Sequence, residues 1–488
     1  MERNRLETES HSDEFDFSIS YQERRWILMI LDIVAINGGL LLSLLLRPDY
    51  DLSWALVLDN PIWFILLTGL WIFSGYLFQA YDLERVGKLD TTLVSVLAAG
   101  FVAVFIYNFI PYLPPALPPS RQPFFITILS PLIFLALVRG LYVLVFSRGT
   151  FRKNVLIVGA GWAGRTIYQS ILEHGLSLYN PVGFVDDDQE KIGQFVEPGL
   201  KKGTGTSEMR SLEVLGSTPG LPALISEHQI STVVLAITRD TRGEVLQILT
   251  NSLQQGVEII PMPVLYEQLT GKVPVEHVGD HWSVTMPLVH PGTKASRRFT
   301  KRLFDIVWAS IGLLGLVVVF PFIALAIYLD SPGPILYRQV RLGRYGRKFQ
   351  VYKFRSMIPD AEKGSAVWAE RDDSRITRVG RILRRTHIDE FPQFINILLG
   401  DMSVVGPRPE RPEFVEQLEE EIPFYRVRLA VKPGMAGWGL IHLGYGSSVE
   451  DMLEKLQYDL YYIKQQNFIL DIYILAHTFM DAITFRGT

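Results

Sequence analysis

The sequence predicts a multi-domain membrane protein with three parts. These are a four-helix transmembrane bundle over residues 1–150, a Rossmann-like α/β domain over 151–290, and a mainly α-helical domain over 291–488 that carries a re-entrant membrane helix at 303–329. Three observations support this fold class: four apolar runs open the chain, a glycine-rich strand-turn-helix pattern follows, and a fifth apolar run lies between two basic flanks. The 488 residues leave room for several domains, and the absence of cysteine excludes disulfides, thiolate metal sites and cysteine nucleophiles.

The four opening runs cover residues 26–46, 61–78, 92–110 and 123–146. Each is close to the ~20 residues that a helix needs to cross a hydrocarbon core. The first run is too long and begins too late for a cleavable signal peptide. Basic residues collect before the first run, between the second and third, and after the fourth, whereas the opposite loops hold only Arg47 and Arg121. The positive-inside rule therefore places both ends of the bundle in the cytoplasm. Arg139 lies inside the fourth run. It could have a functional role, or its side chain could snorkel to the interface or pack within the bundle.

The fifth apolar run, 303–329, would be ~40 Å long as a straight helix and would cross a bilayer. Both of its flanks are strongly basic, however, and so both favour the cytoplasmic side. Pro321 is expected to kink or break the helix, and Asp305 suits the membrane interface better than the bilayer centre. These features predict a re-entrant helical hairpin that enters the inner leaflet and returns. The alternative is an ordinary fifth span, which would place the basic C-terminal region outside the cell.

The middle domain begins with "NVLIVGAGWAGRTIYQSIL" at 154–172, which predicts a strand, a turn with Gly159, Gly161 and Gly164, and a helix. Further strands are expected at 181–188, 231–237 and 256–263, and Asp186 follows Gly164 by 22 residues. This spacing is typical of a dinucleotide fingerprint, in which glycines approach a pyrophosphate and the acid binds a ribose. A purely structural or dimerising domain is the alternative. No tyrosine is followed by a lysine four positions later, which argues against a nucleotide-sugar epimerase or dehydratase.

The third part contains a basic segment followed by paired carboxylates. Residues 338–385 hold fourteen Lys/Arg and five Asp/Glu, which indicates an anionic partner such as phosphate, nucleic acid or acidic lipid head groups. In "LRRTHIDEFPQ" (383–393), Asp389 and Glu390 precede Pro392, an apolar run and Gly400, so we expect them at the N-terminal end of a helix that stops at Gly400. Helix capping would account for one carboxylate. It would not account for the nearby cations, which suit a diphosphate: Lys353, Arg355, Arg384 and Arg408.

An ordered series of motifs in 298–488 resembles the bacterial sugar transferases, the monotopic phosphoglycosyl transferases that load a sugar 1-phosphate onto a polyprenyl phosphate. The matching stretches are "SPGP" (331–334), "RQ" (338–339), "KFRSM" (353–357), "DE-PQ--N-L" (389–398), "GDMSVVGPRP" (400–409), "VKPG" (431–434) and "YDLYYIK" (458–464). The four spans and the Rossmann-like domain resemble the large members, the undecaprenyl-phosphate glucose or galactose phosphotransferases. The resemblance also implies a re-entrant helix, broken here at Pro321.

The resemblance implies a role for each matching residue. Asp389 would be the nucleophile that attacks the β-phosphorus of a UDP-sugar, giving an aspartyl phosphosugar that passes to undecaprenyl phosphate. Glu390 would bind Mg²⁺. Lys353, Arg384 and Arg408 would bind phosphate, and Arg355 either does the same or forms a structural ion pair. The implied donor is UDP-glucose or, next, UDP-galactose. The implied setting is the cytoplasmic face of the inner membrane, among membrane lipids and without nucleic acid, at the start of exopolysaccharide, capsule or O-antigen synthesis.

Two departures from the family pattern concern the bend of the re-entrant helix and the contacts to the donor sugar or nucleotide. Phe320 stands where the family commonly has serine before the proline, and Ala436 and Leu440 replace a threonine and a glutamine. A membrane-bound oxidoreductase and a non-catalytic assembly scaffold are the alternative functions. The apolar segment 468–483 suits an interfacial helix, core packing or a contact within a homodimer, and the sequence does not choose among them.

Overall fold

The computed structural model forms two compact units, Met1–Met262 and Pro263–Thr488. It describes residues 21–47, 49–50, 53–78, 80–81, 89–118, 120–146, 152–176, 178–198, 211–237, 247–248, 250, 256–275, 295–359, 373–422, 424–444 and 448–483. The predicted boundary at residue 290 lies outside these residues, as do several cations of the orientation argument: Arg3, Arg5, Arg85, Lys88, Arg148 and Lys294.

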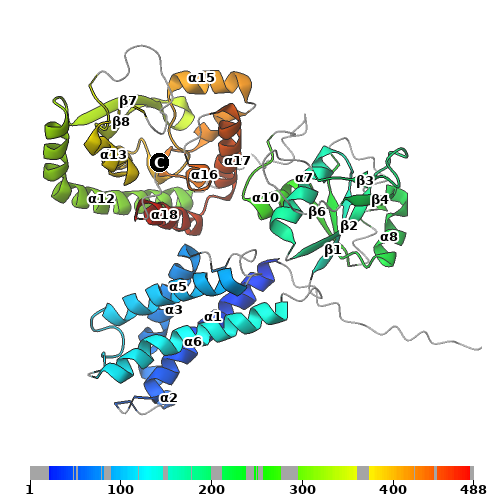
Figure 1. The fold of residues 1–488 in the computed structure, drawn as a ribbon, viewed down its shortest axis with the longest axis horizontal. Coiled ribbons are helices and arrows are strands. Elements are labelled where there is room, and N and C mark those ends of the chain that lie inside the picture. Colours follow the sequence, from blue (N-terminus) through cyan, green and yellow to red (C-terminus); the bar gives the residue numbers. More distant parts are fainter. Residues whose placement is uncertain are drawn as a thin grey trace, which may run out of the picture. The chain divides into compact units, whose positions relative to one another are not determined.

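The first unit opens with a helical bundle made of the predicted apolar runs (Figure 1). α1 packs on α6, and α5 packs on both α3 and α6. α1, α5 and α6 are long and apolar enough to cross a membrane, whereas α3 is a shorter apolar helix of 17 residues. The four predicted runs therefore all form helices, and among the described residues of the bundle a short extra helix precedes α3. The bounds are α1 Tyr21–Leu45, α2 Trp54–Asp59, α3 Pro61–Leu77, α5 Leu89–Phe109 and α6 Arg121–Phe146.

A buried ion pair joins α1 to α6. Nε and Nη2 of Arg139 donate to the two carboxylate oxygens of Asp32 at 2.8 and 2.5 Å, and both side chains are fully buried. Of the roles considered for Arg139, the structure therefore shows packing within the bundle. The two helices also approach closely at Gly39, where an added Cβ would lie 2.4 Å from the Cα of Pro131.

The second half of this unit is a six-stranded mixed sheet in the order β3-β4-β2-β1-β5-β6. Only β3 runs antiparallel to its neighbour. The predicted strands at 181–188, 231–237 and 256–263 correspond to β2, β5 and β6. The glycine-rich turn follows β1, the point from which the strand order runs outward in both directions, as in doubly wound folds. The bounds are β1 Lys153–Val158, α7 Trp162–Ser170, η2 Ile171–Gly175, β2 Tyr179–Val185, β3 Phe195–Val196, β4 Leu212–Gly216, η3 Thr218–Gly220, α8 Leu221–Glu227, β5 Thr232–Leu235 and β6 Glu258–Pro261.

The second unit is mainly α-helical, as predicted, with two small two-stranded sheets (Figure 1). Its core gathers buried side chains from α12, β9, α15, α17 and α18, and it includes Val273 and Val275 from the segment after α10. The bounds are α10 Met262–Thr270, α12 Ala295–Asp330, β7 Leu336–Leu342, η5 Arg344–Gly346, β8 Lys348–Phe354, α13 Arg378–Arg385, η6 Ile388–Glu390, α14 Gln393–Leu399, β9 Ser403–Val405, α15 Pro412–Glu421, η7 Tyr425–Ala430, β10 Gly434–Ala436, α16 Trp438–Leu443, α17 Val449–Gln465 and α18 Phe468–Ile483.

The predicted re-entrant segment lies in α12, a 36-residue helix that continues through Pro321 and is drawn as two limbs meeting at a steep angle (Figure 1). One face of α12 packs into the fold on both sides of the proline, through Leu313, Leu316, Phe320, Ile323 and Ile327. The ring centroid of Phe320 lies 5.7 Å from that of Phe354 in β8. The aromatic residue that replaces the family's serine therefore fills the core on the packed face of α12.

The opposite face of α12 is apolar and exposed, at Ile311, Leu314, Val317, Val318, Phe322, Leu325 and Leu329. Polar side chains fix the first turns of the helix instead. Arg302 donates to the carbonyls of Ile397 and Leu398 at the end of α14, and the Asp305 carboxylate accepts from Ser403 Oγ and Val404 N. The charged start of α12 is thus anchored to the fold, and its apolar length is left to meet an apolar medium.

Candidate active site

Asp389 and Glu390 lie in a short helical turn between two helices. α13 ends at Arg385, His387 adopts a left-handed conformation with φ 57°, and the 3₁₀ turn η6 follows. α14 starts at Gln393, immediately after Pro392, and ends where Gly400 adopts a φ of 92°, so the predicted stop at Gly400 is confirmed. The carboxylates occupy η6 rather than the first turn of α14, because 3₁₀ bonding closes this turn before Pro392.

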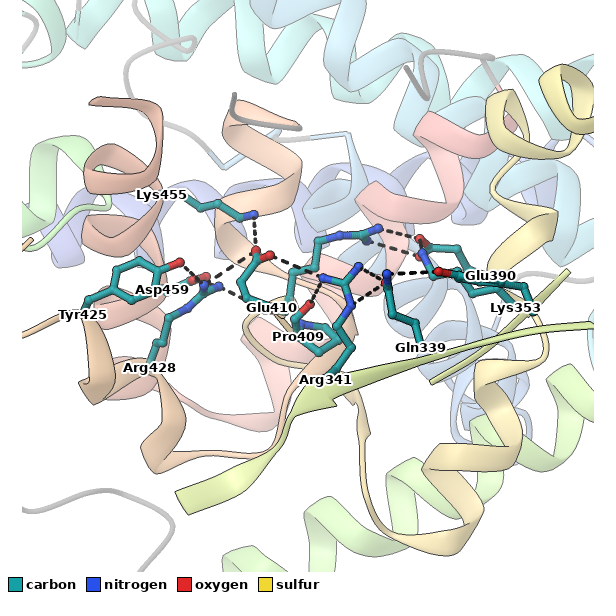
Figure 2. Close-up of polar contacts among 12 residues, drawn as sticks. Gln339, Arg341, Lys353, Glu390, Pro409, Glu410, Tyr425, Arg428, Lys455 and Asp459 are labelled. Atoms are coloured by element: carbon teal, nitrogen blue, oxygen red, sulfur yellow. Dashed lines mark hydrogen bonds and ion pairs between the residues drawn. The ribbon is translucent and has the colours of Figure 1, made fainter. Parts of the chain in front are cut away.

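Glu390 is an anion shared by two cations. Its Oε1 lies 2.7 Å from Nζ of Lys353 and 2.6 Å from Nη2 of Arg408, and its Oε2 lies 3.3 Å from Nη1 of Arg408 (Figure 2). The residue is only 3% exposed. Burial alone would raise the pKa of Glu390, but Arg408 and Lys353 outweigh it and hold that pKa well below its ordinary value. The side chain is therefore a carboxylate at neutral pH.

Asp389 is buried beside this ion-paired group but is not part of it. No residue in the described part of the chain donates a hydrogen bond to its carboxylate. Burial, followed by the negative charge of Glu390, raises the pKa of Asp389 to about 6, although Lys353, Arg384 and Arg408 act in the opposite direction. A carboxylate without hydrogen bonds keeps its lone pairs available, and at pH 7 most of it is ionised.

Lys353 is set against η6 by the side chain of Asn396. β8 pairs antiparallel with β7, so Lys353 lies opposite Tyr337. On the other edge of β8, the buried Asn396 of α14 accepts from the backbone N–H of Tyr352 and donates to the carbonyl of Gln350, at 3.1 and 2.7 Å. The asparagine thus bonds β8 as a neighbouring strand would. It fixes the distance between the lysine-bearing strand and the helix that follows Glu390.

Of the two remaining predicted cations, Arg384 is near enough to act electrostatically on Asp389, whereas Arg355 bonds elsewhere. Arg384 is half-buried at the end of α13, and its charge lowers the pKa of Asp389. The guanidinium of Arg355 donates to the carbonyls of Ser331 and Pro332, just after α12. Gly333, with φ 135°, makes room for it, because an added Cβ would lie 2.1 Å from Nη1 of Arg355. This geometry supports a structural role for Arg355, with carbonyls instead of the ion pair considered above.

A second charged cluster, centred on Glu410, was not predicted from the sequence (Figure 2). Glu410 contacts three cations: Lys455 at 3.3 Å, and Arg428 and Arg341 at 3.6 Å. Arg428 also donates to Asp459 at 2.8 Å. Lys455 and Asp459 are four residues apart in α17, with the buried Leu456 and Leu460 as neighbours on the helix. Two opposite charges at this spacing within an apolar face are a sequence signal for a buried ion pair.

A Mg²⁺ ion suits the donor atoms around η6. No group of three or more potential metal-ligating side chains occurs among the described residues, so a protein-only metal cage is not present there. Mg²⁺ commonly binds through one or two carboxylates, with the substrate phosphates and waters completing the shell. The Asp389 carboxylate accepts no hydrogen bond from the part of the chain that the structure describes, and the Glu390 carboxylate lies beside it. The oxygen donors therefore fit the ion, and Mg²⁺ binding stays a prediction.

The predicted nucleotide-binding residues lie together at the end of β1. Gly159 has φ 108°, Gly161 is the N-cap of α7, and a Cβ on Gly164 would lie 1.9 Å from the carbonyl oxygen of Gly159. Asp186, after β2, accepts from the backbone N–H of Ala160 at 2.8 Å and from Lys191 at 3.1 Å. Its carboxylate thus occupies one N–H of the turn. Nucleotide binding at this turn stays a prediction.

Comparison with known proteins covers both units. Residues 296–485 match the bacterial sugar transferase family, and residues 76–263 match a family described as a CoA-binding domain. A UDP-N-acetylgalactosamine-undecaprenyl-phosphate N-acetylgalactosaminephosphotransferase of Aeromonas hydrophila is 38% identical over 248 residues, 51% of this chain and 57% of that protein. The chain thus spans little more than half of that relative.

Two further relatives match over most of their own length. An exopolysaccharide production protein of Rhizobium leguminosarum bv. phaseoli is 40% identical over 193 residues, 38% of this chain and 96% of the relative. A UDP-glucose:undecaprenyl-phosphate glucose-1-phosphate transferase of Caulobacter vibrioides is 38% identical over 186 residues, 38% of this chain and 70% of the relative.

Proposed function

Because this chain belongs to the bacterial sugar transferase family, we propose that its C-terminal unit transfers a hexose 1-phosphate from a UDP-sugar to undecaprenyl phosphate. One observation carries the proposal. A buried aspartate that accepts no hydrogen bond from the described residues lies beside a glutamate held by a lysine and an arginine. This arrangement offers a nucleophile together with positive charge for phosphate oxygens.

In the first step, a carboxylate oxygen of Asp389 attacks the β-phosphorus of the donor. The bond from that phosphorus to the oxygen bridging the two phosphates breaks, and UMP leaves with the bond's electron pair. The product on the enzyme is a mixed anhydride, an aspartyl phosphosugar. In the second step, a phosphate oxygen of the lipid attacks the same phosphorus and the carboxylate of Asp389 leaves. Splitting one displacement into two in this way is nucleophilic catalysis.

The surrounding side chains position the phosphates and balance their charge. Lys353 and Arg408 converge on Glu390, and the charges of Lys353, Arg384 and Arg408 all act on Asp389, so the nucleophile lies in a cationic environment. A guanidinium can bind two oxygens of one phosphate at once, which favours a single orientation. Glu390, with Asp389 beside it, would hold Mg²⁺, which supplies positive charge to the diphosphate when bound.

We further propose that the reaction takes place at the cytoplasmic face of the inner membrane. The basic flanks of α12 favour that side, and the exposed apolar face of α12 suits the lipid from which the acceptor must come. The re-entrant course of α12 and a homodimer remain predictions. The relatives named above differ in their sugar, since one is named for N-acetylgalactosamine and another for glucose. Glucose is our proposed donor, and the product would start an exopolysaccharide, a capsule or an O-antigen.

The proposal is tested with membranes that contain the protein, undecaprenyl phosphate, Mg²⁺ and each of four donors: UDP-glucose, UDP-galactose, UDP-N-acetylglucosamine and UDP-N-acetylgalactosamine. We expect UMP release with one donor and none above background for Asp389→Asn. UMP release by Asp389→Asn at the wild-type rate would refute the mechanism. If none of the four donors leads to UMP release, the scaffold alternative is favoured. Hydride exchange with NAD(H) would favour the oxidoreductase.

A further inference from the structure

The segment that carries Arg408 has no secondary structure of its own. It runs from Gly406 to Arg411, between β9 and α15, and reads "GPRPER". Two of its six residues are prolines, which have no N–H to donate and cannot take part in a regular hydrogen-bond ladder. Yet Arg408 must hold a fixed position to meet Glu390 at 2.6 Å. The rigidity of this segment has to come from other elements.

Four successive carbonyls of the segment, from residues 407 to 410, each accept a hydrogen bond, and the donors come from three elements, β7, η7 and β10. The backbone N–H of Gly434 donates to Pro407 at 2.8 Å, and the backbone N–H of Leu342 donates to Glu410 at 3.0 Å. The two carbonyls between them accept from side chains. Nη2 of Arg428 donates to the carbonyl of Arg408, and Nη1 of Arg341 donates to that of Pro409, each at 3.1 Å.

The Glu410 side chain connects these two arginines. Its carboxylate lies 3.6 Å from Nη1 of Arg341 on one side and 3.6 Å from Nη1 of Arg428 on the other, and 3.3 Å from Nζ of Lys455. Burial alone would raise the pKa of Glu410, but Lys455, Arg428 and Arg341 lower it to about 2. The carboxylate is therefore ionised at every pH at which the enzyme would work.

Each arginine has further partners that fix its direction. Gln339 Oε1 accepts from Nε and Nη2 of Arg341, at 3.0 and 2.6 Å. Arg428 donates to the Tyr425 hydroxyl at 2.6 Å and to Asp459 at 2.8 Å. Figure 2 shows these contacts as a continuous row from Tyr425 and Asp459, through Glu410, to Glu390 and Lys353. The fork of a guanidinium can serve a carbonyl and a carboxylate together, which a lysine ammonium does less well.

We infer that Glu410, through Arg341 and Arg428, is a positioning residue for Arg408. Glu410 contacts these cations behind the segment, whereas Arg408 meets Glu390. Removing the charge of Glu410 leaves the buried guanidinium of Arg428 and the partly buried one of Arg341 without their shared partner, and their hydrogen bonds to the carbonyls of Arg408 and Pro409 should loosen. The inference rests on the proposed function, in which Arg408 binds the diphosphate of the donor.

The test is a double-mutant cycle on the equilibrium binding of UDP, measured by calorimetry on the full chain in detergent with Mg²⁺ and without acceptor. Glu410→Gln should weaken UDP binding about tenfold in the wild-type background. In the Arg408→Ala background, the same substitution should change the affinity by less than about twofold, because the group it positions is gone. A general loss of fold would instead weaken binding in both backgrounds.

Two controls complete the design. Glu416→Gln removes an exposed carboxylate from the same region, in α15, and should leave UDP affinity unchanged. Glu410→Asp keeps the charge and should recover part of the loss. If Glu410→Gln does not fold, Arg341→Met replaces it in the same cycle, with Arg341→Lys as the charge-retaining variant. Equal losses in both backgrounds, or wild-type affinity in Glu410→Gln, would overturn the inference. Because UDP binding is read without transfer, failure of the proposed reaction is detected separately by UMP release.

Discussion

The ammonium group of Lys353 lies 2.7 Å from the carboxylate of Glu390, although the two residues are 37 positions apart in the chain. Arg408, which follows Glu390 in the chain, contacts the same carboxylate. In the free protein, the Glu390 carboxylate is therefore paired with Lys353 and Arg408, the two cations that the proposed mechanism assigns to phosphate. Binding of the donor must exchange these partners, since the phosphate oxygens and the carboxylate compete for the same donors.

Glu390→Gln should therefore affect both stability and turnover. The substitution keeps the shape of the side chain but leaves Lys353 and Arg408 without their shared anion, and a buried charge without a partner costs about 3 kcal/mol. We expect a lower melting temperature in a thermal unfolding assay and a fall in UMP release of about a hundredfold. Glu416→Gln, an exposed change in the same unit, is the matched control. An unchanged melting temperature would show that the ion pairs do not stabilise the fold.

The pH dependence of the reaction should report Asp389. Its pKa is raised to about 6 in the folded protein, so the acid form persists to a higher pH than for an ordinary aspartate. Only the ionised carboxylate can attack phosphorus. We therefore expect kcat/KM for the UDP-sugar to be level near pH 7.5 and to fall about tenfold per unit below pH 6. A profile that stays level down to pH 5 would contradict this assignment.

The buried pair between Asp32 and Arg139 should stabilise the bundle only as a pair. Arg139→Met leaves a carboxylate buried without its partner and should cost about 3 to 5 kcal/mol, whereas the double variant Asp32→Leu/Arg139→Met should recover most of this loss. Denaturation in mixed micelles, followed by tryptophan fluorescence, measures both. Arg121→Met, at an exposed residue that begins α6, is the control. Additive losses in the double variant would rule out the pairing.

The course of α12 through the membrane can be read with single cysteines, because the natural chain has none. Ser296→Cys places one exposed thiol in the first turn of α12, and Lys348→Cys places one after the helix. If α12 is re-entrant, a membrane-impermeant maleimide should label both only in inside-out vesicles. Ser53→Cys, in the loop before α2, should label from the opposite side. Labelling of positions 296 and 348 from opposite sides would establish a fifth span and place the C-terminal region outside.

The sequence predicted the helices and strands best where one local pattern decides the structure. Apolar runs of the right length formed the bundle, and the glycine spacing placed the turn after β1. Gly400 ended α14 because a left-handed residue is needed there. Pro321 was harder to interpret, since a proline predicts a kink but not whether packing will keep the helix continuous. The apolar face that includes Phe320 and Ile327 continues past the proline and supports α12 on both sides.

Only the site residues that lie in recognisable motifs could be predicted from the sequence. Charge and spacing predicted Asp389, Glu390 and the cations that contact Glu390. They did not predict the residues that support Arg408. Glu410 and Arg428 are ordinary charged residues in the sequence, and only the fold shows that they share a buried ion-pair cluster. Arg355 illustrates the reverse case. It lies in the same motif as Lys353, yet its guanidinium donates hydrogen bonds to carbonyls just after α12. Closeness in sequence does not determine which groups the end of a long side chain contacts.

The proposed mechanism requires Asp389 to become covalently bound to the sugar phosphate, and mass spectrometry of peptides from the reacted protein can detect this bond. The full chain is mixed with UDP-glucose and Mg²⁺ in the absence of acceptor, quenched and digested. We expect the added mass of one hexose phosphate on the peptide that contains Asp389, and we expect this mass to be lost when undecaprenyl phosphate is supplied and to be absent from Asp389→Asn. An adduct on any other residue, or one that persists in Asp389→Asn, would contradict the mechanism.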